Sequence, residues 1–102
     1  MRYRLKFLDE ALKEWVRLDK PIRESFAKKL ASRLDQPLIS SARLGGPLHG
    51  LYKIKLASQG YRLVYQVLEV EVVVLVVSVG RRERQQVYTQ AMSRMKKTPP
   101  PK

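Results

Sequence analysis

The run from Val72 to Val77 constrains the fold of this chain more than any other feature. All six residues are valine or leucine, so a strand made from them is apolar on both faces. Such a strand is typical of the centre of a sheet, or of a position covered on both sides. Gly80 ends the expected strand, and Arg81, Arg82 and Arg84 follow within four residues. A buried strand therefore carries a cluster of cations to one end of the fold.

The first third of the chain has the pattern of one strand followed by two helices. Residues 2–7 alternate polar and apolar side chains, which is the period of a half-buried strand. Asp9 is suited to cap a helix whose apolar side carries Trp15. Pro21 is suited to the first turn of a second helix that runs to about Leu34. We expect the two helices to form a hairpin.

Two further strands and a short helix complete the expected fold. Residues 51–56 and 61–68 alternate apolar and polar side chains and are separated by a four-residue turn. They are therefore expected to pair as a β-hairpin in which Lys55 opposes Arg62. Residues 83 to about 95 have the pattern of a helix.

The fold class is accordingly α+β. We expect an antiparallel-rich four-stranded sheet with an N-terminal helical hairpin and a short C-terminal helix, in the order β-α-α-β-β-β-α. The helices are expected to cover one face of the sheet. Because 102 residues are too few to bury two cores, residues 1–95 are expected to form a single domain. Residues 96–102 are basic and proline-rich and are expected to be a disordered tail.

The charge of the chain favours a polyanionic partner. There are 21 Lys and Arg against 9 Asp and Glu, a net charge of +12, and no acid occurs between residues 36 and 68. Such an imbalance favours nucleic acid, an acidic protein or an anionic membrane surface. The absence of cysteine excludes disulfides and thiolate catalysis. The N-terminus lacks a secretory signal and the valine run is too short to span a bilayer, so we expect a cytoplasmic protein without a membrane partner.

Lys53, Lys55 and Arg62 share one face of the expected hairpin. Like charges that oppose each other across two strands destabilise the pairing by on the order of tenths of a kcal/mol. No nearby acid balances these cations, so the face is suited to an anion that binds from outside. The alternative is a solvated sheet edge on which the lysine stems pack while their amines reach water. Arg82 and Tyr88 join this face if the valine strand lies beside residues 61–68.

The chemistry that remains open to the chain is that of lysine, arginine and tyrosine. No P-loop or dinucleotide-binding glycine pattern is present, His49 is the single histidine, and the acids lack metal-ligand spacing. Neither a cofactor nor a metal is therefore expected. Lysine, arginine and tyrosine can still cleave RNA, because arginine stabilises the charged transition state while the 2′-hydroxyl attacks the adjacent phosphodiester. Packing Lys53 and Lys55 near Arg62 is expected to lower the lysine pKa, since like charges disfavour the protonated form.

Four segments together resemble the RelE toxins of the RelE/ParE toxin–antitoxin superfamily. These are "LDEALKEWVRLDKPIRESFAKKL", "YKIKL", "GYRLVYQV" and "SVGRRERQQVY", and the resemblance in order and spacing extends from Tyr3 to Met95. The resemblance implies a ribosome-dependent endoribonuclease that cleaves mRNA in the A site and inhibits translation. It also implies an acidic antitoxin of the RelB type, and operator DNA as a partner only of the toxin–antitoxin complex.

The resemblance also implies roles for individual residues. Lys53 and Lys55 match the lysines for proton transfer and phosphate contact, and Arg62 matches the transition-state arginine. Arg82 matches the arginine near the scissile phosphate and leaving group, and Tyr88 matches the tyrosine that orients or activates the 2′-hydroxyl. Whether Lys or Tyr is the base stays open. Further RNA contacts are expected from Arg81, Arg84 and Arg43. Gly45 stands where the loop is expected to carry a basic residue, so either Arg43 substitutes for it or that contact is missing.

Two other functions stay open. A ParE-like gyrase inhibitor belongs to the same superfamily, but the set Lys53, Lys55, Arg62, Arg82 and Tyr88 is then expected to be incomplete, and here it is complete. The other is a basic nucleic-acid-binding module without chemistry, acting as a corepressor with its antitoxin. Composition does not separate that module from the enzyme.

Overall fold

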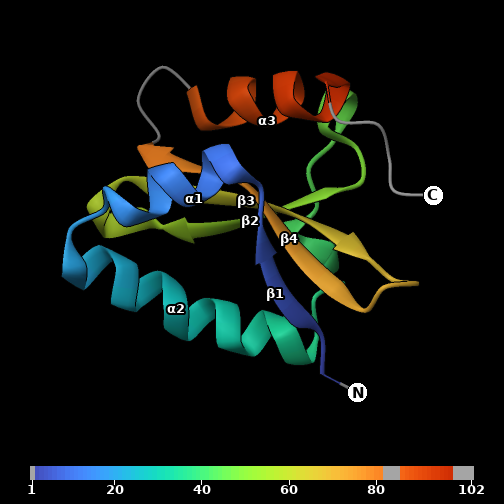
Figure 1. Cartoon of the computed structure of the whole chain (residues 1–102), viewed down its shortest axis with the longest axis horizontal. Helices are drawn as coiled ribbons and strands as arrows, with labels where there is room; N and C mark the ends of the chain where they lie inside the picture. The colour runs from blue at the N-terminus through green and yellow to red at the C-terminus, as the bar shows by residue number, and fades with distance from the viewer. Residues whose placement is uncertain (1, 82–85, 98–102) are drawn as a thin grey trace.

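The computed structural model describes residues 2–81 and 86–97 (Figure 1). Within these residues the strands are β1 (Arg4–Phe7), β2 (Leu51–Leu56), β3 (Tyr61–Leu68) and β4 (Val73–Arg81). The α-helices are α1 (Asp9–Val16), α2 (Lys20–Asp35) and α3 (Gln86–Lys97), and the short 3-10 helices are η1 (Ser40–Ala42), η2 (Gly46–Leu48) and η3 (Ala57–Gln59). The α+β class and the order β-α-α-β-β-β-α are confirmed.

The valine-rich strand β4 lies inside the sheet, between β1 and β3. The strand order is β1-β4-β3-β2, in which β1 is parallel to β4 and the other two pairs are antiparallel. The pairing of β3 with β4 shifts within the ladder: Val64 pairs with Ser78, whereas Tyr65 pairs with Val76. Val77 is therefore the extra residue of a β-bulge. The central position that the valine run predicts is confirmed.

Both faces of the sheet are covered, so the expectation of helices on one face is wrong. One core contains the α2 side chains Phe26 and Leu30. A second core, on the side of α3, is made of Leu51, Val64, Val77, Val87 and Ala91. Figure 1 shows α2 and α3 on opposite sides of the sheet. The physical reason is β4, whose valines project from both faces and have to be buried on both.

A buried ion pair joins α3 to α1. Arg94 donates from Nη1 and Nη2 to the two carboxylate oxygens of Glu14, at 2.7 and 3.0 Å, and also to the Val77 carbonyl at 2.8 Å. Glu14 accepts a further hydrogen bond from the Val79 N–H at 3.2 Å. The side chains of Arg94 and Glu14 are 9% and 19% exposed, and the hydrogen-bonded carboxylate raises the pKa of Arg94 above its ordinary value. The pair thus fastens two helices to the same part of β4.

The helix boundaries differ slightly from the expected ones. The cap of α1 is Leu8, so Asp9 is the first helical residue, where its carboxylate still interacts favourably with the helix dipole. Pro21 lies in the first turn of α2, as predicted. Helix α3 continues to Lys97, beyond the expected domain end at residue 95, while residues 83–85 and 98–102 lie outside the described residues. None of the described helices is long and apolar enough to span a membrane.

Candidate active site

The hairpin of β2 and β3 has the register that the sequence predicts. Lys55 lies opposite Arg62, and the connecting turn ends at Gly60, whose φ of 71° is in the left-handed region that favours glycine. Directly opposed residues project from the same face of a sheet, and so do residues two apart on one strand. Lys53, Lys55 and Arg62 therefore share one face. The prediction that these three cations lie on the same face of the hairpin is confirmed.

Arg62 is buried although it carries a permanent charge. Arg62 is 7% exposed, and its Nη1 donates to the Tyr61 carbonyl at 3.0 Å. Among the described residues it forms no ion pair with a carboxylate. Gly80 lies opposite Arg62 on β4 and has no side chain that could crowd the guanidinium. The remaining N–H donors of Arg62 are thus available to an anion on this face.

The environment of Lys53 favours its neutral form. Burial lowers the pKa of Lys53 below its ordinary value, and the neighbouring charges of Lys55 and Arg62 lower it further. Lys53 is half-buried, whereas Lys55 is exposed. The predicted direction of the pKa shift is confirmed for Lys53, so a larger fraction of this side chain is deprotonated, and able to act as a base, than for an isolated lysine at the same pH.

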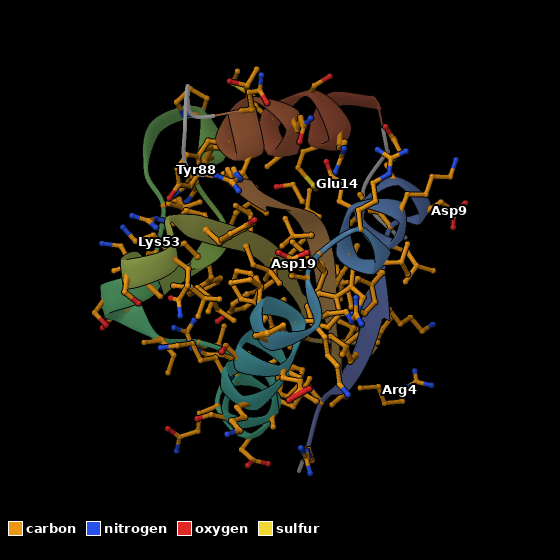
Figure 2. The ribbon with its side chains drawn as sticks, turned by 90° about the vertical axis from the view of Figure 1, so that its left-hand side faces the viewer. Arg4, Asp9, Glu14, Asp19, Lys53 and Tyr88 are labelled. Atoms are coloured by element: carbon orange, nitrogen blue, oxygen red, sulfur yellow. The ribbon has the colours of Figure 1, made fainter. Side chains whose placement is uncertain are left out.

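Tyr88 lies on the same face as the cations. It is half-buried in the first turn of α3 and packs against the core that contains Leu51 and Val64. Leu51 precedes Lys53 by two residues on β2, and Val64 lies opposite Lys53 on β3. Figure 2 shows Tyr88 and Lys53 on the same side of the molecule, Tyr88 at the helix and Lys53 at the sheet. The structure therefore brings a phenol to the cationic face.

Two contacts that the sequence did not indicate hold α3 in place. The Ser78 hydroxyl donates to the Val87 carbonyl at 2.7 Å, so it fixes the residue that precedes Tyr88. Arg94 anchors the other end of the helix through Glu14. Serine in a strand and arginine on a helix are ordinary surface patterns, so no sequence signal distinguishes these anchors. These two contacts fix the position of α3 and therefore also that of Tyr88 in its first turn.

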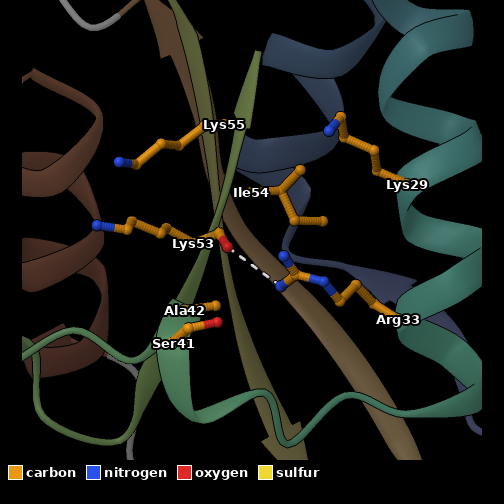
Figure 3. Close-up of a pocket in the computed structure, with 7 residues that line it drawn as sticks. All are labelled: Lys29, Arg33, Ser41, Ala42, Lys53, Ile54 and Lys55. Atoms are coloured by element: carbon orange, nitrogen blue, oxygen red, sulfur yellow. Dashed lines mark hydrogen bonds between the residues drawn. The ribbon is translucent and has the colours of Figure 1, made fainter. Parts of the chain in front are cut away.

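A third unpredicted contact holds β2 at Lys53. Arg33 of α2 donates from Nη1 to the Lys53 carbonyl at 3.1 Å and to the Tyr65 hydroxyl at 2.8 Å. The Tyr65 hydroxyl donates in turn to the Pro37 carbonyl at 2.7 Å. Figure 3 shows Arg33 approaching from α2 while the side chains of Lys53 and Lys55 extend toward α3. Arg33 therefore fixes the backbone of Lys53 from the opposite side of the strand.

The other predicted site residues are placed less centrally or lie outside the described residues. Arg81 is exposed at the end of β4, with its guanidinium carbon 5.4 Å from the centroid of the Tyr61 ring. Arg43 is exposed and forms an isolated bridge with Tyr52, one residue before Lys53. The two predicted residues outside the described part of the chain are Arg82 and Arg84. The structure thus brings together Lys53, Lys55, Arg62 and Tyr88.

The arrangement is suited to a phosphodiester. Arginine and lysine donors can hold its oxygens, a buried guanidinium can stabilise charge that develops on phosphorus, and a lysine with a lowered pKa or a phenol can move a proton. Among the described residues, no group of three or more His, Asp or Glu side chains could hold a metal ion.

Comparison with known proteins identifies the family. Residues 5–86 match the family described as the ParE toxin of the type II toxin–antitoxin system parDE. The chain is 50% identical over 95 residues to the mRNA interferase toxin RelE of Escherichia coli K12, covering 93% of this chain and 99% of that protein.

Solved structures agree with this match. An arginine-to-alanine double mutant of the E. coli toxin RelE in the free state superposes with a TM-score of 0.84 and 48% identity, covering 93% of this chain and 99% of that one. The same mutant in complex with a peptide of the antitoxin RelB has a TM-score of 0.77 and 49% identity, covering 89% and 95%. The chain therefore belongs to the RelE toxins of the RelE/ParE superfamily of type II toxin–antitoxin systems.

Proposed function

We propose that this chain is a ribosome-dependent endoribonuclease that cleaves mRNA in the A site and so inhibits translation. The observation that carries the proposal is the cationic face itself. Lys53, Lys55 and Arg62 converge beside Tyr88, and the pKa of Lys53 is lowered by burial and by the neighbouring cations. The name mRNA interferase, which the E. coli relative bears, supports the same activity.

The proposed reaction needs no group beyond the side chains and the RNA. The 2′-hydroxyl oxygen attacks the adjacent phosphorus, the bond from phosphorus to the 5′-oxygen breaks, and a cyclic phosphate and a 5′-hydroxyl result. Lys53 or Tyr88 accepts the proton of the 2′-hydroxyl, and a protonated group returns one to the leaving oxygen. Arg62 holds the phosphate oxygens, where charge increases in the transition state, and Lys55 contacts the phosphate. Arg82 is assigned to a position near the scissile phosphate and the leaving oxygen.

The proposed partners follow from charge. A chain with a net charge of +12 is suited to an acidic antitoxin of the RelB type that covers the cationic face. The E. coli relative in complex with a RelB peptide supports this partner. Operator DNA is proposed as a partner of the toxin–antitoxin complex only, and the cytoplasm as the place where the toxin meets ribosomes.

Primer extension on a message under translation tests the activity. With purified chain, we expect new 5′ ends within codons when ribosomes are present and none on the same RNA alone. Tyr88→Phe is the matched variant, because it removes one hydroxyl and retains the ring.

Two results would contradict the proposal. If no ends form on ribosomes while DNA gyrase is inhibited by the same preparation, the chain is a ParE-like poison, as the name of the matched family allows. Binding of RNA without any cut indicates a binding module or corepressor.

A further inference from the structure

A groove lies between α2 and the outer edge of β2. Its volume is about 240 Å³, and it is lined by Lys29, Arg33, Ser41, Ala42, Lys53, Ile54 and Lys55. Figure 3 shows Lys29 and Arg33 on the α2 side of the strand, with the two β2 lysines directed toward α3. All the charged side chains in this lining are cationic.

The α2 cations of the groove have hydrogen-bonding capacity to spare. Arg33 uses Nη1 for its bonds to Lys53 and Tyr65, and among the described residues its Nη2 and Nε have no partner. Lys29 is exposed and, within the described part of the chain, forms no ion pair. Ser41 adds a hydroxyl from η1. These donors match the oxygens of a phosphate group.

The groove is continuous with the candidate active site. β2 is an outermost strand of the sheet, and both Lys53 and Lys55 line the groove at its edge. The side chains of the same two lysines belong to the cationic face, so the two surfaces meet at β2. A strand of RNA whose phosphate lies on that face can pass over the edge of β2 and reach Arg33 and Lys29 without leaving cationic surface.

We propose that this groove binds a backbone phosphate of the RNA substrate that lies farther along the strand than the phosphates at the cleavage site. The inference rests on the proposed RNA-cleaving function. An acidic peptide is the weaker candidate, because the apolar lining consists of Ala42 and Ile54, which are 5% and 1% exposed. The groove therefore offers a peptide no apolar pocket in which to anchor a side chain.

Lys29→Gln tests the groove without disturbing the fold, since the side chain is exposed. Lys28→Gln is the matched control, because it makes the same charge change one residue earlier on α2 and does not line the groove. The probes are a 2′-O-methyl trinucleotide and a 2′-O-methyl nonanucleotide, which cannot be cut because the attacking hydroxyl is blocked. Equilibrium binding is measured over a range of salt concentrations.

We expect Lys29→Gln to weaken binding of the nonanucleotide by about threefold and to make its log–log salt slope shallower by about 0.7, as for one lost phosphate contact. The trinucleotide, which is too short to enter the groove from the active site, is expected to bind both variants equally. Lys28→Gln should leave the nonanucleotide slope unchanged.

Three outcomes would overturn the groove. The first is an unchanged nonanucleotide slope for Lys29→Gln, and the second is an equal change of slope for both variants. The third, measured with a hexaglutamate peptide as an additional probe, is a larger loss of affinity for this peptide than for RNA in Lys29→Gln. Primer extension with wild-type chain separates this failure from failure of the proposed function. If the wild type cuts mRNA and Lys29→Gln binds like the wild type, the groove assignment alone is wrong.

Discussion

Replacing Arg94 by methionine removes the charge that joins α3 to α1. Methionine keeps most of the apolar stem, so the loss is confined to the guanidinium. Glu14 is then left as a carboxylate that is 19% exposed, with the Val79 N–H as its remaining hydrogen-bond donor, and the Val77 carbonyl loses Arg94. Breaking a buried pair in this way costs about 3–5 kcal/mol. Because Glu14 retains one donor and some water, we expect a loss of about 2–3 kcal/mol in the free energy of unfolding.

The assay is urea unfolding followed by the fluorescence of Trp15. This residue is the single tryptophan, lies on α1, and packs against Phe7 with 5.3 Å between ring centroids. Arg17→Met is the control, because Arg17 is exposed, and a surface change of this kind is expected to stay within about 0.5 kcal/mol of the wild type.

The double variant Glu14→Leu with Arg94→Met tests the cause. If the loss comes from an unpaired buried charge, the double variant should be more stable than Arg94→Met alone, because removing the unpaired carboxylate outweighs the loss of the acceptor for the Val79 N–H. An Arg94→Met protein as stable as Arg17→Met would refute the reasoning, since α3 would then be held by apolar packing alone.

Three predictions concern the cationic face. Tyr88→Phe should lower single-turnover cleavage by about 10²-fold or more while equilibrium binding of RNA is unchanged; cleavage at the wild-type rate would transfer the proton-transfer role to Lys53 or Lys55. If Lys53 is the base, the cleavage rate should rise with pH and reach half of its plateau below pH 10.5, the ordinary pKa of lysine, and Lys55→Gln should move that midpoint to higher pH because one pKa-lowering charge is lost; a profile that does not move would exclude Lys53. Binding of single-stranded RNA should have a log–log salt slope of roughly −3 if Lys53, Lys55, Arg62 and Arg82 all meet phosphates; a flat salt response would remove the electrostatic interpretation.

Features that depend on local pattern could be predicted from the sequence. The register of Lys55 against Arg62 follows from two alternating segments and a four-residue turn, and the structure has that register. The inside position of β4 follows from valines on both of its faces. The bulge at Val77 could not be predicted, because within a run of similar valines a shift of one residue changes no visible pattern.

Features that depend on distant segments could not be predicted. A short amphipathic helix shows that it covers a sheet but not which face it covers, so the expectation that all the helices lie on one face is wrong. Glu14 and Arg94 are 80 residues apart, and each has the pattern of a surface charge on its own helix. Arg33 looks equally ordinary on α2, yet its contact with the Lys53 carbonyl forms only when α2 lies along β2.

The inside position of β4 also sets the order in which the chain can fold as it is synthesised. β1 pairs with no strand other than β4 in the described sheet, and α3 packs over that same strand, so the first strand waits for residues 73–81 to emerge. Partners so distant along the chain form late in folding. The face that carries Lys53 and Tyr88 is thus completed only after α3 (Gln86–Lys97) has been synthesised. A protein proposed to attack ribosomes therefore lacks Tyr88 at its cationic face until α3 has emerged from the ribosome that makes it.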